Sequence, residues 1–391
     1  MIPKKKIVND PIHGFIDIPA GIIYDLLEHP WMQRLRNIKQ LGLSHLVYPG
    51  ACHSRLGHAL GAMHLMKEAI ASLRAKGHGI TNDETEAALC AILLHDVGHG
   101  PFSHTLESAI VEKVHHEQLS LLFMKHLNEQ FGGRLDKAIA IFEGKYKKRF
   151  LHQLVSGQLD VDRLDYLLRD SFFSGVAEGM VGVERILKML DVVDDELVVE
   201  AKGIYSVEKF LISRRLMYWQ VYLHKTVIAA DRLLLEILSR ARTLMHAGVQ
   251  VFASPALAYF LKKSPALHDF ESGEALHLFA LLDDSDIDCA VKVWMQHDDE
   301  LLSDLSGMLV HRRLPKIGLS DRPFEESELK KAGTMMWYGE ILNKGYESRL
   351  EKIKIRMPGG VLCDIYDVSD MLNSQAFSKV TKKYYLCYPG K

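Results

Sequence analysis

The chain has 391 residues, of which 48% are hydrophobic and 25% are charged, values that are ordinary for a soluble globular protein. A formal net charge of −2 excludes a global basic field that would attract nucleic acid. The five cysteines lie far apart, which argues against a zinc ribbon or a disulfide framework and fits a reducing compartment. The basic N-terminus leads into no apolar segment, and the longest apolar run, 87–94, is too short to cross a bilayer, so we expect a cytoplasmic protein without a signal peptide.

The front of the chain reads predominantly as helix. Apolar side chains at helical spacing predict helices over 21–42, with a new segment at Pro30, and over 58–76. Thr81 to Glu84 has the T-x-x-E form of a capping box, so a helix begins there and continues to a break at 98–101. Further helices are expected from Phe102 or Ser103 and over 115–131, 151–170 and 205–245.

Strand signals are fewer and come later. Residues 192–200 form a predicted hairpin with Asp194 and Asp195 as its turn. Helix is expected again up to His311, followed by polar stretches with strand-like pieces at 352–356 and 384–387. We therefore predict a mainly α protein, with a helical core and N-terminal segment over 1–245 and a smaller helical and α+β portion over 246–391.

Four side chains suggest a metal site. His95 and Asp96 lie at the end of the capped helix, and two adjacent side chains there can converge on one ion. His58 and Asp162 are the candidates for the remaining ligands. Two imidazoles and two carboxylates suit Mn, Fe, Zn, Ni or Mg better than a thiolate metal, and they leave positions open for water and phosphate oxygen.

The residues after Asp96 strengthen this interpretation. The segment 95–104 holds three histidines, one aspartate and two glycines, and glycines let the backbone turn sharply and approach a ligand closely. The alternative is a plain helix end with a histidine favoured by the helix dipole. Such an end has no need of three histidines.

These motifs together resemble the HD superfamily of metal phosphohydrolases, in particular the deoxynucleoside triphosphate triphosphohydrolases of the SAM-and-HD type. The resemblance covers roughly residues 5–240, and no counterpart of the SAM domain is recognised. It rests on five segments in the same order: 9–14, 33–42, 48–58, 95–104 and 160–166.

The resemblance implies roles for residues around the metal. Arg55, Arg163 and Arg214 contact the phosphates, and Lys225 is a further candidate cation. Hydrolysis needs an acid that protonates the leaving 5′ oxygen. We favour His104, oriented by Glu107 three residues later, with His116 and His99 assisting at the phosphate.

The resemblance also implies a nucleoside site. Tyr166 and Asp170 share a helix face and would cradle the deoxyribose, with the carboxylate on the 3′ hydroxyl. Gln40, Leu41 and Tyr222 match further sugar or base contacts, and Tyr218 stands where relatives have a histidine near the base.

The leading hypothesis is that a dNTP and water give a deoxynucleoside and inorganic triphosphate, by a homo-oligomer that is a dimer or a tetramer. Two alternatives stay open: hydrolysis of another phosphoester, such as a nucleoside monophosphate or cyclic nucleotide, and a weakly catalytic nucleotide sensor or nucleic-acid binder.

Residues 6–11 with Arg34 and Arg36 resemble part of an allosteric nucleotide site between subunits. An edge strand followed by a surface helix is the other interpretation of that segment.

Overall fold

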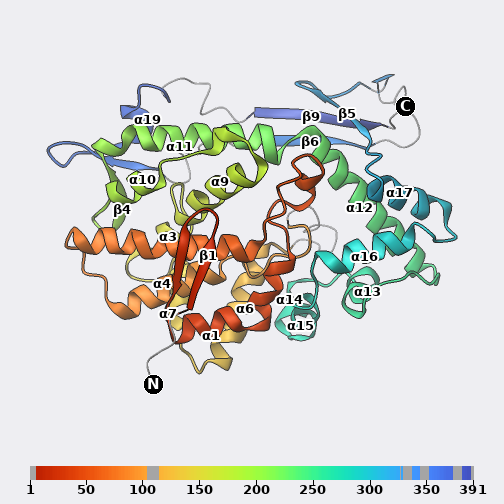
Figure 1. Cartoon of the computed structure of the whole chain (residues 1–391), viewed down its shortest axis with the longest axis horizontal. Coiled ribbons are helices and arrows are strands. Elements are labelled where there is room, and N and C mark those ends of the chain that lie inside the picture. Colours follow the sequence, from red (N-terminus) through yellow and green to blue (C-terminus); the bar gives the residue numbers. More distant parts are fainter. Residues whose placement is uncertain are drawn as a thin grey trace.

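The computed structural model describes residues 6–103, 114–325, 327–328, 337–343, 352–372 and 381–388. Helices form most of it, and three small sheets lie at the periphery (Figure 1). The predicted mainly α fold is therefore confirmed. Among the described residues, no helix combines the length and the hydrophobicity that a bilayer crossing requires.

The front portion contains the helices that carry the predicted site. Its elements are β1 (Lys6–Asp10), β2 (Gly14–Ile18), α1 (Ile22–Glu28), α2 (Pro30–Gln33), η1 (Arg34–Asn37), η2 (Gly42–Leu46), α3 (Arg55–Ala75), α4 (Asn82–Leu94), α6 (His116–Gln130), α7 (Asp136–Phe142), α8 (Arg149–Val155), α9 (Val161–Ser174), η3 (Ala177–Gly179), α10 (Val183–Met189), β3 (Leu190–Val193), β4 (Glu196–Glu200), η4 (Ala201–Gly203), α11 (Ile204–Met217), η5 (Tyr218–Tyr222) and α12 (Lys225–His246).

Helix α3 is the centre of this portion. It is buried on most of its surface, and α4 and α9 both pack against it. A helix that is apolar nearly all round belongs in the interior of a large domain. Figure 1 shows α9 above α3, and the β1–β2 hairpin in front of both. The first turn of α3, the end of α4 and the first turn of α9 thereby meet at one place.

The back portion is smaller and more mixed. Its elements are α13 (Pro255–Lys262), α14 (Leu267–Glu271), α15 (Glu274–Phe279), α16 (Asp284–Trp294), α17 (Glu300–Val310), β5 (Lys316–Ser320), β6 (Trp337–Asn343), β7 (Lys354–Arg356), β8 (Leu362–Asp364), α19 (Ile365–Val368) and β9 (Thr381–Tyr388). Strand β7 pairs in parallel with β4 of the front portion, and β5 and β6 flank β9. The division at 245/246 stays a proposal, and the two portions share one sheet.

Several local predictions are confirmed. Thr81 and Glu84 form the capping box of α4, with reciprocal side chain to backbone hydrogen bonds. β3 and β4 form the expected hairpin, and Asp194 and Asp195 take positive φ in its turn. Positive φ at both central residues gives the turn twist that matches a hairpin.

Other boundaries were wrong. The helix predicted over 151–170 is broken between α8 and α9, and Asp160 caps the second helix by accepting from the Arg163 backbone N–H at 2.7 Å. The helix predicted over 205–245 is interrupted by the π-helical turn η5. Phe102 and Ser103 do not begin a helix, because both take positive φ in a turn.

Candidate metal centre and active site

The four predicted metal ligands meet at one point, although they come from three helices. His58 lies in the first turn of α3, His95 and Asp96 follow the last residue of α4, and Asp162 lies in the first turn of α9. Ligand atoms of His58, His95 and Asp162 all lie within 4.8 Å of one another. Asp96 joins them, with Oδ1 3.4 Å from His95 Nε2 and Oδ2 3.7 Å from His58 Nε2.

The spacing of these atoms fits a divalent ion. Ligands about 2.1 Å from a metal and roughly 90–110° apart lie about 3.0–3.4 Å from each other. His58 Nε2 lies 3.0 Å from Asp162 Oδ1 and 3.4 Å from His95 Nε2, and His95 Nε2 lies 3.5 Å from Asp162 Oδ1. The donor set and its spacing therefore suit a divalent ion.

Hydrogen bonds on the far side of each imidazole direct Nε2 towards the centre. His58 Nδ1 lies 2.8 Å from Asp165 Oδ2, and His95 Nδ1 lies 2.6 Å from the carbonyl oxygen of Ile92. Both partners are acceptors, so each Nδ1 carries a proton, and each Nε2 would offer its lone pair once an ion displaces the second proton. Metal-binding histidines commonly have such an acceptor behind them.

The electrostatics of the cluster also favour a cation. Burial lowers the pKa of His58, but hydrogen bonds and charge from Asp162 and Asp165 raise that pKa to about 10. Burial likewise lowers the pKa of His95, and Asp96 and Asp162 more than reverse the effect. Burial raises the pKa of Asp162, yet His58 and His95 hold it well below its ordinary range. The carboxylates thus favour a positive charge at this point, which a divalent ion would supply.

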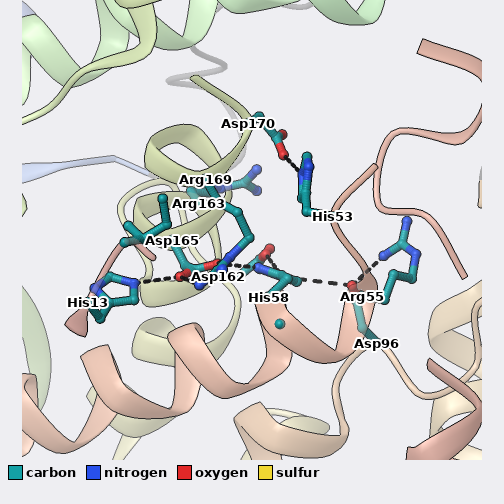
Figure 2. A network of polar contacts seen from close by, with 12 residues as sticks. His13, His53, Arg55, His58, Asp96, Asp162, Arg163, Asp165, Arg169 and Asp170 are labelled. Carbon is teal, nitrogen blue, oxygen red and sulfur yellow. Dashed lines mark hydrogen bonds and ion pairs between the residues drawn. The ribbon is translucent and has the colours of Figure 1, made fainter. Parts of the chain in front are cut away.

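Two arginines border the centre (Figure 2). Arg55 lies one helical turn before His58, forms an ion pair with Asp96 and donates from Nε to the Ser103 hydroxyl at 2.8 Å. Arg163 donates from Nε to the Gly157 carbonyl at 2.7 Å and lies 3.2 Å from Asp160. Both line the adjoining cavity, so a phosphate group near the metal would meet two guanidinium groups.

A cavity of about 400 Å³ opens beside the metal centre. It is lined by Gln40, Leu41, Arg55, Asp96, His99, Phe102, Ser103, His116, Glu117, Asp160, Asp162, Arg163, Tyr166, Asp170, Tyr218 and Tyr222, among others. Two of the proposed metal ligands and both arginines therefore share this cavity with three tyrosines and Asp170. The π-helical turn η5 supplies Tyr218 and Tyr222, and such turns are frequent at functional sites.

Asp170 is held from two sides within this cavity. Tyr222 donates its hydroxyl to Oδ2 at 2.7 Å, and His53 Nε2 lies 2.8 Å from Oδ1. The ring of Tyr222 meets that of Tyr166 edge to face, with centroids 6.2 Å apart. Two aromatic rings and an oriented carboxylate thus share one wall.

The remaining predicted residues fall into three groups. His99 and His116 stack with ring centroids 3.9 Å apart and line the cavity, and burial together with Arg55 lowers the pKa of His99 well below its ordinary value. Arg214 does not line the cavity; its guanidinium donates to Gln158 at 3.4 Å and lies over the Tyr218 ring. Lys225, at the start of α12, does not line it either. His104 and Glu107 lie outside the described residues.

Arg34 has a structural role that was not predicted. Its buried guanidinium donates to the carbonyl oxygens of Val97 and Leu282 at 2.7 and 3.0 Å. It therefore fixes the turn after Asp96 to the back portion of the chain. Arg36 is exposed and donates to Gln33.

Sequence reasoning missed a set of residues behind the ligands. His53 contacts Asp170, and Asp165 contacts His58. Arg169 donates to Asp165. None of these three residues was assigned a role. One signal was available: Asp165 lies three residues after Asp162, and His53 five before His58, inside motifs already identified. Asp10 and His13 also lie inside an identified segment, 9–14, but nothing in that segment linked them to the metal ligands.

Comparisons with known proteins agree with this site. The HD domain matches residues 55–170, and the HD associated region matches residues 181–254. A crystal structure described as a phosphohydrolase from Bacteroides thetaiotaomicron is 50% identical, with a TM-score of 0.95 over 99% of this chain and 100% of that one. The uncharacterized protein YwfO of Bacillus subtilis is 34% identical over 80% of this chain and 72% of its own length.

Relatives whose names state a substrate are less similar in sequence. The human deoxynucleoside triphosphate triphosphohydrolase SAMHD1 is 30% identical over 61% of this chain, and its Dictyostelium discoideum homolog is 32% identical over 57%. The matched regions span only 45% and 46% of those two proteins. On the evident match of motifs, site and fold, the chain belongs to the HD superfamily of phosphohydrolases.

Proposed function

We propose that the protein hydrolyses deoxynucleoside triphosphates to a deoxynucleoside and inorganic triphosphate. The single observation that carries this proposal is the lining of the cavity, in which the metal ligands Asp96 and Asp162 and two arginines stand beside Tyr166, Asp170 and Tyr222. A cavity of about 400 Å³ falls within the range of small-ligand sites. The activity in the names of the two SAMHD1 relatives supports the same substrate.

At the phosphate end, His58, His95, Asp96 and Asp162 would hold the divalent ion. When bound, such an ion supplies Lewis acidity towards a phosphate oxygen. Arg55 and Arg163 balance the negative charge of the triphosphate, and Arg55 can do so while it still pairs with Asp96. Burial and Arg55 lower the pKa of His99 well below its ordinary value, so His99 would border the phosphate as a neutral imidazole rather than as a cation.

At the nucleoside end, the Asp170 carboxylate would accept a hydrogen bond from the 3′ hydroxyl. Tyr166 and Tyr222 would form one wall beside the sugar, and their crowding would disfavour a 2′ hydroxyl. Gln40 has a buried Oε1 without a hydrogen-bond partner in the described part of the chain. A buried acceptor in a cavity wall is available to a ligand, because leaving it unsatisfied is costly.

The reaction breaks the bond between the α-phosphorus and the 5′ oxygen, and a proton must reach that oxygen as it leaves. We keep His104 as the proposed acid, with Glu107, His116 and His99 in support. A dimer or tetramer and a cytoplasmic location also stay predictions.

The test is to incubate the full chain with each dNTP, each ribonucleotide and Mn²⁺, and to separate the products by anion-exchange chromatography. We expect equal amounts of deoxynucleoside and triphosphate, with slower turnover of ribonucleotides. Asp96→Ala should abolish product, whereas Tyr205→Phe, which alters an exposed tyrosine, should not.

Other products would contradict the proposal. Release of monophosphate or diphosphate would show that a different bond is broken. Turnover of nucleoside monophosphates or cyclic nucleotides, with none of dNTPs, would favour the phosphoester alternative. Nucleotide binding without turnover in the parent protein would favour a sensor.

A further inference from the structure

The turn of the β1–β2 hairpin reaches the interior of the HD domain. Asp10 ends β1, and its Oδ1 accepts from the backbone N–H groups of Ile12 and His13, both at 2.9 Å. These bonds shape the turn and leave Oδ2 free to accept from Arg169 Nη1 at 2.8 Å. The His13 side chain points the same way, and its Nε2 lies 2.6 Å from Asp165 Oδ1 (Figure 2).

Both contacts end on the residues behind the metal ligand His58. Arg169 donates to both oxygens of Asp165, from Nε at 2.8 Å and from Nη2 at 2.9 Å. Asp165 Oδ2 in turn accepts from His58 Nδ1 at 2.8 Å. The Asp165 side chain is fully buried, and those of Asp10, His13 and Arg169 are at most 7% exposed. Asp10, His13 and Arg169 therefore set the orientation of the Asp165 carboxylate.

Helix α3 is shaped to accept this arrangement. Gly61 lies one turn after His58, and a Cβ at that position would come within 1.9 Å of Asp165 Oδ1 and 2.3 Å of Arg169 Nη2. Any larger side chain would thus displace the pair. Gly61 leaves the space that Asp165 and Arg169 occupy. Independently of it, the two hairpin contacts hold Asp165 against His58.

We propose that Asp10 and His13 are positioning residues of the metal centre, which hold Asp165 and Arg169 so that Asp165 keeps Nε2 of His58 directed at the cation. The inference rests on the proposed ligand set and not on the identity of the substrate. Neither residue is a proposed ligand: His13 acts directly on Asp165, and Asp10 acts on it through Arg169. The N-terminal hairpin then helps to position the metal centre, although the proposed metal ligands all lie after residue 57.

A purely structural role for the hairpin makes a different prediction. If the two contacts only anchor β1 and β2, their loss would lower stability and leave the metal affinity of the folded protein unchanged. If they position His58, the loss of either would weaken metal binding in protein that is still folded. Outer partners of metal ligands typically contribute about 10- to 100-fold to affinity.

The experiment measures Mn²⁺ binding to the full, metal-stripped chain by isothermal titration calorimetry, with folding checked by circular dichroism. The variants are Asp10→Asn, His13→Ala and His13→Gln. Asp10→Asn keeps the shape and the acceptor of the turn, but removes the charge facing Arg169. The matched control is Asp17→Asn on β2, whose side chain is 59% exposed and 3.7 Å from Lys67.

We expect Asp10→Asn and His13→Ala to weaken Mn²⁺ binding about 10- to 100-fold. His13→Gln should restore part of the affinity, because its amide can still donate to Asp165, and Asp17→Asn should bind as the parent does. In turnover assays, kcat at fixed Mn²⁺ should fall and the KM for the nucleotide should change little.

Folded Asp10→Asn and His13→Ala that bind Mn²⁺ as the parent does would overturn the inference and leave the proposed function intact. A parent that binds no Mn²⁺ would overturn the ligand set and the inference together. A parent that binds Mn²⁺ but turns over no dNTP would overturn the proposed substrate alone, and the effects of the variants on binding would still decide the inference.

Discussion

Nε2 of His53 lies 2.8 Å from Oδ1 of Asp170, and the imidazole of His53 stacks on the ring of Phe173 with centroids 4.6 Å apart. The other carboxylate oxygen accepts from Tyr222. Asp170 is therefore oriented before any ligand arrives. Preorganised acceptors improve affinity because less freedom is lost on binding.

Tyr222→Phe should raise the KM for dNTPs with little effect on kcat. The change removes one hydrogen bond to Asp170, about 1 kcal/mol, which corresponds to roughly a fivefold change in affinity. Steady-state kinetics with one dNTP would measure it. His53→Ala should act in the same direction, and Tyr205→Phe is the exposed control. A drop in kcat with an unchanged KM would show that Asp170 acts on the chemical step instead.

Metal binding should stabilise the folded protein. Because the four ligands come from three helices, an ion at their centre ties these helices together. At Mn²⁺ concentrations of about 100 times Kd, the free energy of unfolding should rise by about 2.7 kcal/mol. Thermal denaturation of chelator-treated protein, with and without Mn²⁺, measures the change.

Asp162→Ala should remove that stabilisation, because it deletes a ligand and one of the two carboxylates at the centre. Asp304→Ala, at an exposed position of α17, should retain it. An equal increase in the melting temperature of parent and Asp162→Ala would place the ion elsewhere.

The parts of the site that were predictable share a local signal. His95, Asp96 and the residues up to 103 stand together in the sequence, and the T-x-x-E box fixed the start of α4 in advance. The convergence of His58 and Asp162 on them followed from the family resemblance. Helix α4, marked by its capping box and the apolar run 87–94, was predicted close to its observed bounds.

What was not predictable depends on contacts across long sequence separations. The break between α8 and α9 depends on Asp160, which caps α9. The helical spacing of apolar residues continues across the break, so it predicts one uninterrupted helix. Asp10 and His13 meet Arg169 and Asp165 only because the hairpin folds back over α3 and α9. The burial of Arg34 likewise depends on carbonyl groups almost 250 residues away. No short sequence pattern predicts contacts between residues so far apart in the chain.

Gly98→Ala should perturb the active site and lower stability. A Cβ at Gly98 would lie 2.3 Å from the His116 carbonyl oxygen and 2.3 Å from the Ser120 backbone nitrogen. Backbone atoms cannot rotate away, so the start of α6 must shift, at a cost of about 1–3 kcal/mol. His116 should then move relative to His99, and kcat should fall.

Urea denaturation and steady-state kinetics would test both effects. Gly79→Ala is the matched control, since nothing lies within 4 Å of a Cβ there and its φ is not positive. Unchanged stability and turnover in Gly98→Ala would show that α6 can adjust freely at this contact.

Glu84 should stabilise the protein above pH 4.5 and lose this effect in acid. Burial raises its pKa, but Lys148, the Thr81 backbone N–H and Tyr146 together lower the pKa from 4.5 to about 2. A pKa that is lower in the folded state gives stability that is complete above the unfolded value and is lost as the pH falls through the folded one. The window is therefore between about pH 4.5 and pH 2.

The substitution Glu84→Gln isolates the charge, because glutamine can still complete the capping box of α4. At pH 7 the variant should be less stable by about 1 kcal/mol, mainly through the lost pairing with Lys148 at 2.7 Å. Urea denaturation of both proteins at several pH values should show this difference shrinking from about pH 4.5 downwards. A difference that stays constant down to pH 2 would mean that lost packing, rather than lost charge, destabilises the variant.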